Sequence, residues 1–459
     1  MKKQLTRTRV MVLGLASALV FGILTPSYAT TTITVWTYGD VIDKSLVNTY
    51  EAAHPGINIR AINQGSPAAV KQKFQLYKNS SSVADVIVYE TDDAGYFRHY
   101  GSLFKNLNNY PGASSLSSYY LSWRWNQGVA ENGNLIGLPT DVGGLAVAYR
   151  KDLFAAAGLP TSPSKVGKLW KSSSTTTSWN KFISVGKQFQ NAPATKSNHK
   201  VKGFIDSTGT IFKAALNQGT KKFYSGGSPA LDNSQLKKAF NIAAAAATAT
   251  PTIGARINPY GGSDWTPGLS SGAFAVTLAP AWQLDYIIHR APSSRGKWNI
   301  AAAPGNGGNV GGSQLAIPKK SQHASQAWDF ISWYESPYAQ LKMFKKRRLF
   351  PSASVLYNPY STCVGVTTGS GASATPALTS ADCNYVRSFK DSFFNNAKVG
   401  AIYADSALNL HSIPSGRLER QFTDAFQNQI GRLEAKKVTD PTVAWNKAVS
   451  DAQTVARRN

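Results

Sequence analysis

The chain has 459 residues, of which 42% are hydrophobic and 16% are charged. This composition supports a large core in two or more domains and excludes a disordered chain, and the absence of heptads or repeats argues against a coiled coil or a solenoid. Lysine and arginine number 49 against 24 acidic residues, a formal net charge of +25. The basic residues are diffuse, with the densest run at 342–348, so a solvated basic face is favoured over a patch for polyanions.

The N-terminal segment has the layout of a secretory signal peptide. Lys2, Lys3, Arg7 and Arg9 precede an apolar run over 10–24, and small residues lead to Ala29. The run is short for a membrane span, which is the alternative, so we expect residues 1–29 to be removed. No cysteine lies near the expected cut, so the mature protein is expected to be periplasmic, extracellular or associated with the cell wall, and not a lipoprotein.

The remaining chain alternates strand and helix patterns. Strands are expected at 33–36, 57–62, 85–89, 135–139, 145–149 and 273–278, with strand-like runs at 300–304 and 314–318. Helices are expected at 40–54, 67–77, 151–157, 179–189, 236–247 and 325–333, and over most of 417–457. We expect a polar loop at 162–178, with Ser178 as the N-cap of the following helix. The order predicts parallel sheets with crossover helices, the α/β class.

Two cysteines remain in the exported chain, Cys363 and Cys383, separated by a segment rich in glycine, serine and threonine. In an oxidising compartment they are most simply one disulfide. A metal or catalytic thiol is the alternative, but no histidine or further cysteine sits at ligand spacing.

Motifs for catalysis are missing from the sequence. There is no G-x-S-x-G elbow, no H-E-x-x-H and no EF-hand loop, and the six histidines form no close pair at metal spacing. Asp92 and Asp93 follow a buried strand, where α/β sites lie, so a carboxylate pair of a glycosidase stays open as an alternative. Gly305 to Gly312 opens no helix and does not fit a dinucleotide loop. We expect no cofactor and no metal.

Aromatic residues are numerous, with 11 Trp, 20 Tyr and 20 Phe. Several fall at strand ends or in loops, beside carboxyl and amide side chains. Flat aromatic platforms together with such polar groups suit the apolar ring faces and hydroxyl rims of sugars. The candidates of this kind are Trp36, Tyr38, Asp40, Gln64, Tyr89, Asp92, Asp93, Trp123, Trp125, Asp141, Trp265 and Trp282.

The ordered motifs resemble those of the extracellular solute-binding proteins that serve carbohydrate ABC importers, the maltose-binding-like group. The matching stretches are Ile33-Thr-Val-Trp36, Tyr50-Glu-Ala-Ala-His-Pro-Gly-Ile-Asn-Ile59, Ala84-Asp-Val-Ile-Val88 with Tyr100-Gly-Ser-Leu103, Gly137-Leu-Pro-Thr-Asp-Val-Gly-Gly144 with Tyr149-Arg-Lys-Asp-Leu-Phe154, Gly158-Leu-Pro160, Ser178-Trp-Asn-Lys-Phe182, 274–282, Gly311-Gly-Ser313 with Ala316-Ile-Pro318, and Ala327-Trp-Asp-Phe330. Each is weak alone, but their order covers most of the exported chain.

The resemblance implies a type II periplasmic-binding fold in which two lobes enclose a ligand cleft and close by a hinge. Lobe 1 would comprise 30–141 plus 281–333, and lobe 2 would comprise 142–280 plus 334–459. Crossings are expected near 141–144, near 279–282 and after Trp333. Carried over by position, the ligand residues would be Trp36, Asp40, Tyr89, Asp92, Asp93, Asp141, Gly143, Trp282, Gly312 and Ser313. Gln64 and Trp265 are added as expected ligand residues only because they are polar and aromatic side chains near strand ends or in loops, and not because of the resemblance.

The expected function is therefore a monomeric, non-enzymatic receptor that binds a sugar or oligosaccharide and delivers it to the permease subunits of an importer. No nucleic-acid partner is expected. The alternatives are a receptor for a polyamine, a phosphate ester or an iron chelate, and a secreted glycan-active enzyme that uses Asp92 or Asp93.

Overall fold

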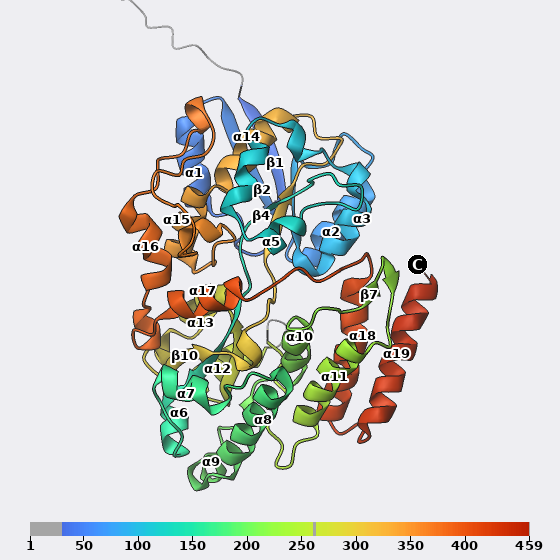
Figure 1. Cartoon of the computed structure of the whole chain (residues 1–459), viewed down its shortest axis with the longest axis vertical. Helices are drawn as coiled ribbons and strands as arrows, with labels where there is room; N and C mark the ends of the chain where they lie inside the picture. Colours follow the sequence, from blue (N-terminus) through green and yellow to red (C-terminus); the bar gives the residue numbers. More distant parts are fainter. Residues whose placement is uncertain (1–29, 260–262, 459) are drawn as a thin grey trace, which may run out of the picture.

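Two α/β lobes, one above the other in Figure 1, make up the described part of the chain. This computed structural model describes residues 30–259 and 263–458, and the expected signal peptide lies outside them. Each lobe contains a mixed sheet flanked by helices, which confirms the predicted fold class. Within the described residues, no helix combines the length and the apolar character that crossing a membrane requires.

The upper lobe contains a five-stranded sheet in the order β2-β1-β3-β11-β4. β1 pairs in parallel with β2 and β3, whereas β11 runs antiparallel to β3 and β4. Alternate residues of β1 lie in different cores, because Val35 packs with α1 and Trp36 packs with α2. The elements are β1 (Thr31–Thr37), β2 (Ile57–Asn63), β3 (Val86–Glu90), β4 (Leu138–Pro139), β11 (Ser313–Ala316), α1 (Lys44–Ala53), α2 (Pro67–Tyr77), α3 (Ala94–His99), α5 (Ser122–Asn126), α14 (Ala324–Tyr334), α15 (Pro337–Arg347) and α16 (Ser380–Ser388).

The lower lobe contains a four-stranded sheet in the order β10-β5-β9-β6. Its central strands β5 and β9 are buried along their whole length, as the continuous apolar runs predicted. The elements are β5 (Leu145–Arg150), β6 (Gly203–Ile205), β9 (Phe274–Pro280), β10 (Trp298–Ala302), the small hairpin β7 (Tyr224–Ser225) and β8 (Ser228–Pro229), α6 (Lys151–Ala156), α7 (Pro163–Leu169), α8 (Thr175–Asn191), α9 (Pro193–Ser197), α10 (Gly209–Leu216), α11 (Ser234–Ala247), α12 (Trp265–Ser271), α13 (Ala281–Arg290), α18 (Glu419–Glu434) and α19 (Pro441–Arg458).

Chain crossings between the lobes differ from those expected. The first lies between β4 and β5, at 140–144, as predicted. The second lies at 303–312 and not near 279–282, because β10 pairs antiparallel with β5 and keeps α13 in the lower lobe. The last follows α16, since α15 packs against α1 and α14 of the upper lobe. The expected assignment of 281–312 to lobe 1, and of the start of 334–459 to lobe 2, therefore differs from the structure.

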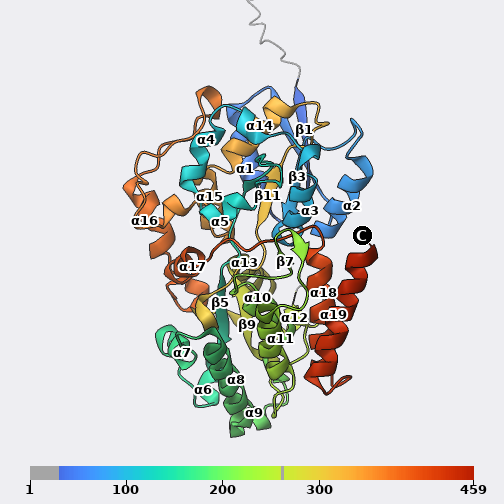
Figure 2. The same ribbon diagram turned by 45° about the vertical axis from the view of Figure 1, so that its right-hand side comes forward.

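The last crossing passes through α17 (Val399–Leu408), which packs against β5 and β10. The segment from α17 to α18 then runs between the lobes in both ribbon views (Figures 1 and 2). It contacts the upper lobe, where Arg98 donates to the Ser415 hydroxyl, and the lower lobe, where His411 lies 3.2 Å from the Gly219 carbonyl oxygen. This segment ties the two lobes together outside the paired strands.

The expected polar loop at 162–178 is wrong, because α7 occupies its first part. α8 also begins a turn earlier than predicted. The Ser174 side chain accepts a hydrogen bond from the Thr177 backbone N–H and caps the helix, while Ser178 lies buried inside it. The serine- and threonine-rich run before α8 contains several residues that could cap the helix. The helix starts where its apolar face can be buried, and this selects Ser174 as the cap.

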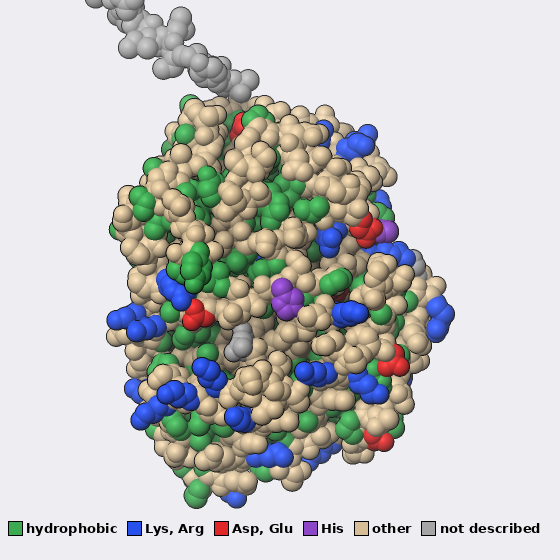
Figure 3. All heavy atoms as spheres, viewed as in Figure 1, with side chains coloured by type: hydrophobic (Ala, Val, Ile, Leu, Met, Phe, Trp, Pro, Cys, Tyr) green, Lys and Arg blue, Asp and Glu red, His purple; other side chains and the backbone are tan. Residues whose placement is uncertain are grey.

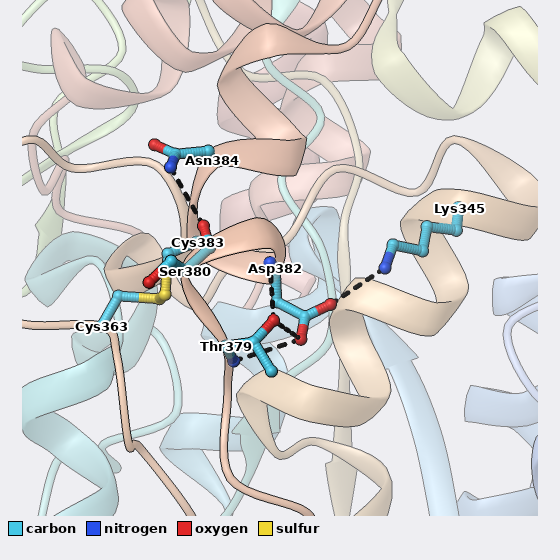
Figure 4. The surroundings of a disulfide bond; sticks show 7 residues. All are labelled: Lys345, Cys363, Thr379, Ser380, Asp382, Cys383 and Asn384. Carbon is cyan, nitrogen blue, oxygen red and sulfur yellow. Dashed lines mark hydrogen bonds and ion pairs between the residues drawn. A yellow bond between two sulfur atoms is a disulfide. The ribbon is translucent and has the colours of Figure 1, made fainter.

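The predicted disulfide between Cys363 and Cys383 is present (Figure 4). It ties an irregular segment to α16, whose N-terminus is closed by a capping box between Thr379 and Asp382. Asp382 also pairs with Lys345 of α15 at 3.0 Å, so the cross-linked loop is attached to the upper lobe at two points.

Close backbone approach at the crossing explains Gly143. A Cβ atom built on it would lie 1.9 Å from the Val310 carbonyl oxygen, on the neighbouring crossing strand. The two crossings are also joined by a hydrogen bond of 2.8 Å from the Val310 N–H to the Gly143 carbonyl oxygen. Only glycine permits this separation.

We expect Gly143→Ala to lower the free energy of unfolding by about 1–3 kcal/mol, because the two crossing strands must move apart. The matched control is Gly431→Ala in the interior of α18, where the added methyl meets nothing within 4 Å. That change should be stabilising by about 0.5–1 kcal/mol, through the helix propensity of alanine. Urea denaturation of both variants measures this, and an unchanged Gly143→Ala would contradict the tight crossing.

Candidate ligand-binding site between the lobes

The carboxyl end of β3 brings three acidic residues to the seam between the lobes. β3 ends at Glu90, and a single turn over Thr91–Asp93 leads into α3. Thr91 holds this turn in place, because its N–H donates to the Gly312 carbonyl at 3.0 Å and its hydroxyl donates to the Gly311 carbonyl at 3.1 Å. The carboxylates therefore stand on a fixed edge of the sheet, where sites of α/β proteins lie.

These carboxylates pair with two basic residues of the lower lobe. Asp92 lies 2.5 Å from the Lys213 ammonium of α10. Arg420 of α18 lies 2.5 Å from Glu90 and 2.8 Å from Asp93. We call these five residues the cross-lobe network. Asp93 is also paired with Lys71 of α2 at 3.0 Å, within the upper lobe. The seam is thus closed by ion pairs that join separate lobes.

Burial and charge set the protonation of the network. Burial, helped by the charge of Asp92, raises the pKa of Glu90 to about 7. Burial also disfavours ionised Asp92, but Lys213 and Arg420 outweigh it and hold its pKa below the usual value. The pKa of Lys213 is raised, since the attraction of Asp92 and Glu90 exceeds the effect of burial. Asp92 and Lys213 are therefore charged at neutral pH, while Glu90 titrates near it.

Two cavities adjoin the network. A narrow one of about 20 Å³ between the lobes is lined by Asp92, Trp123, Gln127, Asn217, Lys222 and Asn309, among others. It has room for about one water molecule and not for a sugar. A larger one of about 640 Å³ lies in the lower lobe and is lined by Ser207, Gly209, Thr210, Arg256, Asn258, Asp424, Gln427, Asn428, Gly431, Glu434 and Ala435. Its volume lies in the range of small-ligand pockets.

The larger cavity reaches the network through Asp424 of α18. Burial raises the pKa of this carboxyl group. The charge of Arg420 lowers that pKa and the charge of Asp92 raises it, so both network residues act on Asp424. Glu434, at the other end of the lining, accepts a hydrogen bond of 2.9 Å from the Thr208 N–H and is thereby occupied. The lining therefore offers amide, hydroxyl and backbone groups together with the Arg256 guanidinium, beside a network whose charges largely neutralise one another.

Two aromatic residues of the lower lobe lie at another part of the seam. Trp282 and Tyr286 of α13 meet edge to face with ring centres 5.5 Å apart, and the Trp282 indole N–H donates to the Val310 carbonyl at 2.9 Å. A Cβ atom on Gly39 of the upper lobe would lie 3.7 Å from the Tyr286 hydroxyl. The Tyr38 hydroxyl lies 2.6 Å from the Ser313 hydroxyl. The structure thus brings Trp282 and Ser313 to the seam.

Asp141 and Gly312 join Gly143 in the framework of the crossings. The Asp141 carboxylate accepts hydrogen bonds from the Thr140 hydroxyl and from the Ser313 N–H, the latter at 3.1 Å, and burial raises its pKa. A Cβ on Gly312 would lie 2.8 Å from the Asp141 carbonyl oxygen. These residues bond to or contact other residues of the crossings, so their role here is structural.

Several expected ligand residues have partners inside one lobe. Trp36 is buried, with the Lys73 ammonium 4.7 Å from its ring centre, and Lys73 also donates to Gln64 at 3.2 Å. Asp40 is exposed and paired with Arg347 of α15, which also pairs with Asp285 of α13 in the lower lobe at 3.2 Å. The structure does not bring these three into the cross-lobe network.

Two further candidates lie in cores. The Tyr89 hydroxyl donates to Gln314 at 2.7 Å in the interior of the upper lobe. Trp265 is buried in the lower lobe, where its indole N–H lies 3.1 Å from Asp206. Both side chains stabilise the lobes from within and face no cavity wall described above.

Sequence reasoning missed Glu90, Lys213, Arg420, Asp424 and Tyr286. Glu90 could have been found, since it ends the same buried strand as the predicted Asp92 and Asp93. Lys213 and Arg420 are single basic residues in helical patterns, and no motif marks them. Only the packing of α10 and α18 beside α3 and β3 shows their role.

The family whose model is described as "Bacterial extracellular solute-binding protein" matches residues 45–362, well over half of the chain. The chain belongs to this family. Its members bind solutes, and the cross-lobe network and the narrow cavity lie between the two lobes.

Known proteins agree with this assignment. The chain is 23% identical over 212 residues to the "Arabinooligosaccharide-binding protein" of Bacillus subtilis (strain 168), and this match spans 44% of the chain and 45% of that relative. A crystal structure of an "Extracellular solute-binding protein family 1" is similar with TM-score 0.76 and 27% identity, over 93% of this chain and 99% of that one.

A binding protein of Bifidobacterium animalis subsp. lactis Bl-04 in complex with β-1,6-galactobiose shares the fold, with TM-score 0.69 and 18% identity over 93% of this chain and 98% of that chain. The galacto-N-biose/lacto-N-biose I-binding protein of Bifidobacterium longum also shares the fold, with TM-score 0.68 and 15% identity over 94% of this chain and 98% of that chain.

Arg420→Gln should open the seam of this solute-binding protein, because Glu90 and Asp93 then lose their cross-lobe partner and repel each other. Dyes on cysteines placed at exposed Leu76 and Val443, one in each lobe, report the separation by energy transfer. We expect transfer to fall. The control is Lys447→Gln, which removes an exposed pair within α19. Equal transfer in the two variants would contradict closure by the network.

Glu90→Gln should have an effect on stability that depends on pH. Because the pKa of Glu90 is about 7 in the folded chain against 4.5 for an ordinary glutamate, the folded state binds a proton between these values that the unfolded state does not. The stability from Glu90 therefore falls as pH rises through that window. Urea titrations should find the variant close to wild type at pH 5 and more stable by about 1–3 kcal/mol at pH 8.

The opposite order would contradict this account of Glu90. A variant that is less stable than wild type at pH 8, and equal to it at pH 5, would mean that pairing with Arg420 outweighs the burial of the Glu90 charge.

Proposed function

We propose that this solute-binding protein binds a neutral sugar or short oligosaccharide between its lobes and delivers it to the permease subunits of an ABC importer. The observation that carries the proposal is the polar cavity of about 640 Å³ in the lower lobe, which reaches the cross-lobe network at the seam through Asp424. Closure of the lobes around the ligand would present both to the permease. The protein would act as a monomer and needs no cofactor for this task.

Charge balance favours a neutral ligand over the alternatives. Lys213 and Arg420 are already paired with the carboxylates at the end of β3, so neither offers a free charge to a phosphate ester. The same pairing leaves Asp92 and Asp93 unavailable to a polyamine. The cavity itself is lined by one basic residue, Arg256, and by the acidic residues Asp424 and Glu434, so its charges are of both signs. Its amide and hydroxyl groups, such as Asn258, Thr210 and Gln427, suit hydroxyl-rich ligands.

Relatives support the sugar as ligand. The names of similar proteins include an arabinooligosaccharide-binding protein and complexes with β-1,6-galactobiose and lacto-N-biose. Ion pairing also argues against the alternative of a glycan-active enzyme, because Asp92 and Asp93 are both held by cations and neither stands free as a general acid.

A thermal-shift screen of residues 30–459 tests the proposal. The panel contains neutral mono- and oligosaccharides, polyamines, sugar phosphates and iron chelates. A ligand at 100 times its dissociation constant should raise stability by about 2.7 kcal/mol. We expect a shift with one class of neutral sugar, recovered intact and without new reducing ends. A shift with only a charged class, or release of reducing ends, would overturn the proposal.

Trp282→Ala should weaken binding of that sugar at least tenfold, about 1.4 kcal/mol, because the proposal gives the indole at the seam the role of an aromatic platform for the sugar ring. The control is Tyr360→Ala, which removes an aromatic ring from a site that is 95% exposed. Calorimetric titration of both variants compares the affinities. An affinity unchanged by Trp282→Ala would remove this tryptophan from the ligand site.

A further inference from the structure

The basic charge of the chain is unevenly divided between the lobes. Residues 30–141, in the upper lobe, contain eight Lys and Arg against nine Asp and Glu. Residues 151–202, in the lower lobe, contain nine lysines and one acidic residue, Asp152. Lys and Arg side chains accordingly gather over the lower half of the molecule in Figure 3. Basic residues also exceed acidic ones at 313–348 of the upper lobe, by seven to two, but residues 151–202 contain the excess with the fewest acidic residues.

No ion pair among the described residues neutralises these lysines. Asp152 is bound by the Arg150 guanidinium at 2.6 Å and is thereby already neutralised. None of the nine lysines forms an ion pair with another described residue. Seven of them are exposed, and we call these seven the basic face: Lys165, Lys168, Lys171, Lys181, Lys196, Lys200 and Lys202.

The basic face lies on helices packed side by side at the lower end of the molecule. α7, α8 and α9 and the residues that follow them carry it, and α8 contacts both α7 and α9. Lys181 of α8 donates to the Lys171 carbonyl at 3.1 Å, so the lysines of neighbouring elements lie close together. Like charges held together without partners destabilise the isolated protein, which is the expected mark of a surface that meets an anionic partner.

We propose that the basic face docks reversibly on the anionic headgroups of a phospholipid membrane and so keeps the protein close to its membrane. Lysines spread over several helices match a broad, laterally charged surface better than a narrow polymer chain. The exposed large apolar side chains of the described residues, Leu76, Tyr77, Tyr360, Val364 and Val443, all lie outside 151–202. The face therefore offers no ring for stacking nucleic-acid bases and no apolar anchor for insertion, so binding is electrostatic.

This docking is independent of the solute bound between the lobes. The cross-lobe network and the polar cavity use other elements, and none of the seven lysines lines that cavity.

The test is sedimentation of residues 30–459 with vesicles of phosphatidylglycerol and phosphatidylcholine in equal parts, at 0.05 M salt, and with vesicles of phosphatidylcholine alone. We expect binding only to the anionic vesicles and its loss at 1 M salt, where charges are screened beyond about 3 Å. The variant K165Q/K181Q/K196Q/K200Q should bind at least about fifty-fold more weakly, since each lysine near such a surface contributes about fivefold.

The matched control, K44Q/K319Q/K320Q/K342Q, removes four exposed lysines from the upper lobe and should bind within about twofold of wild type. Thermal melting confirms that both variants are folded. Equal losses in the two variants would mean that net charge alone binds vesicles and would overturn the proposal. Binding to a soluble polyanion such as heparin without binding to anionic vesicles would overturn it as well. Failure of the sugar screen with intact vesicle binding would refute the proposed ligand and leave the docking surface standing.

Discussion

The pairing of acidic residues at the end of β3 with Lys213 and Arg420 is the interaction on which the closed structure depends. It is the point at which a strand of the upper lobe meets α10 and α18 of the lower lobe. Buried ion pairs are costly to desolvate and gain little net stability, so their value here is positional. They hold the lobes in one register while leaving room beside them for a polar cavity. Loss of a partner exposes charges to water only if the lobes separate, so the network couples ion pairing to hinge motion.

The pairing of charged residues differs between two regions of the molecule. At the seam, opposite charges stand within hydrogen-bonding distance and cancel, which favours a neutral solute. On the helices at the lower end, lysines stand together without acidic partners, which favours an anionic surface. Under the two proposals, the seam selects a solute and the basic face keeps the protein near its membrane. The tight crossing at Gly143 and the segment between α17 and α18 link the regions by restricting how the lobes move.

Much of the fold could be predicted from sequence, because it follows from local patterns. Apolar runs such as those of β5 and β9 mark buried strands. The chain has only two cysteines, so their pairing as one disulfide could be predicted. The chain crossings could not be placed correctly, since the partner of β10 is decided by pairing with a strand far away in the sequence. For the site, Asp92 and Asp93 were identifiable from their place after a buried strand. Trp265 shows the limit of this reasoning, because a tryptophan near a strand or loop end can face a cavity or the core, and here it is buried in the core. Arg420 carries no local signal, since its role arises only when α18 packs against the upper lobe.

Small-angle X-ray scattering of residues 30–459 without ligand tests the central claim most directly, because it measures the separation of the lobes in solution. At 0.05 M salt the curve should fit the closed structure, and at 1 M salt the radius of gyration should rise as screening weakens the cross-lobe pairs. The change should be reversible on dialysis. A radius of gyration that is the same at both salt concentrations would contradict the account, since it would show that contacts other than the ion pairs of Asp92, Glu90 and Asp93 hold the lobes together.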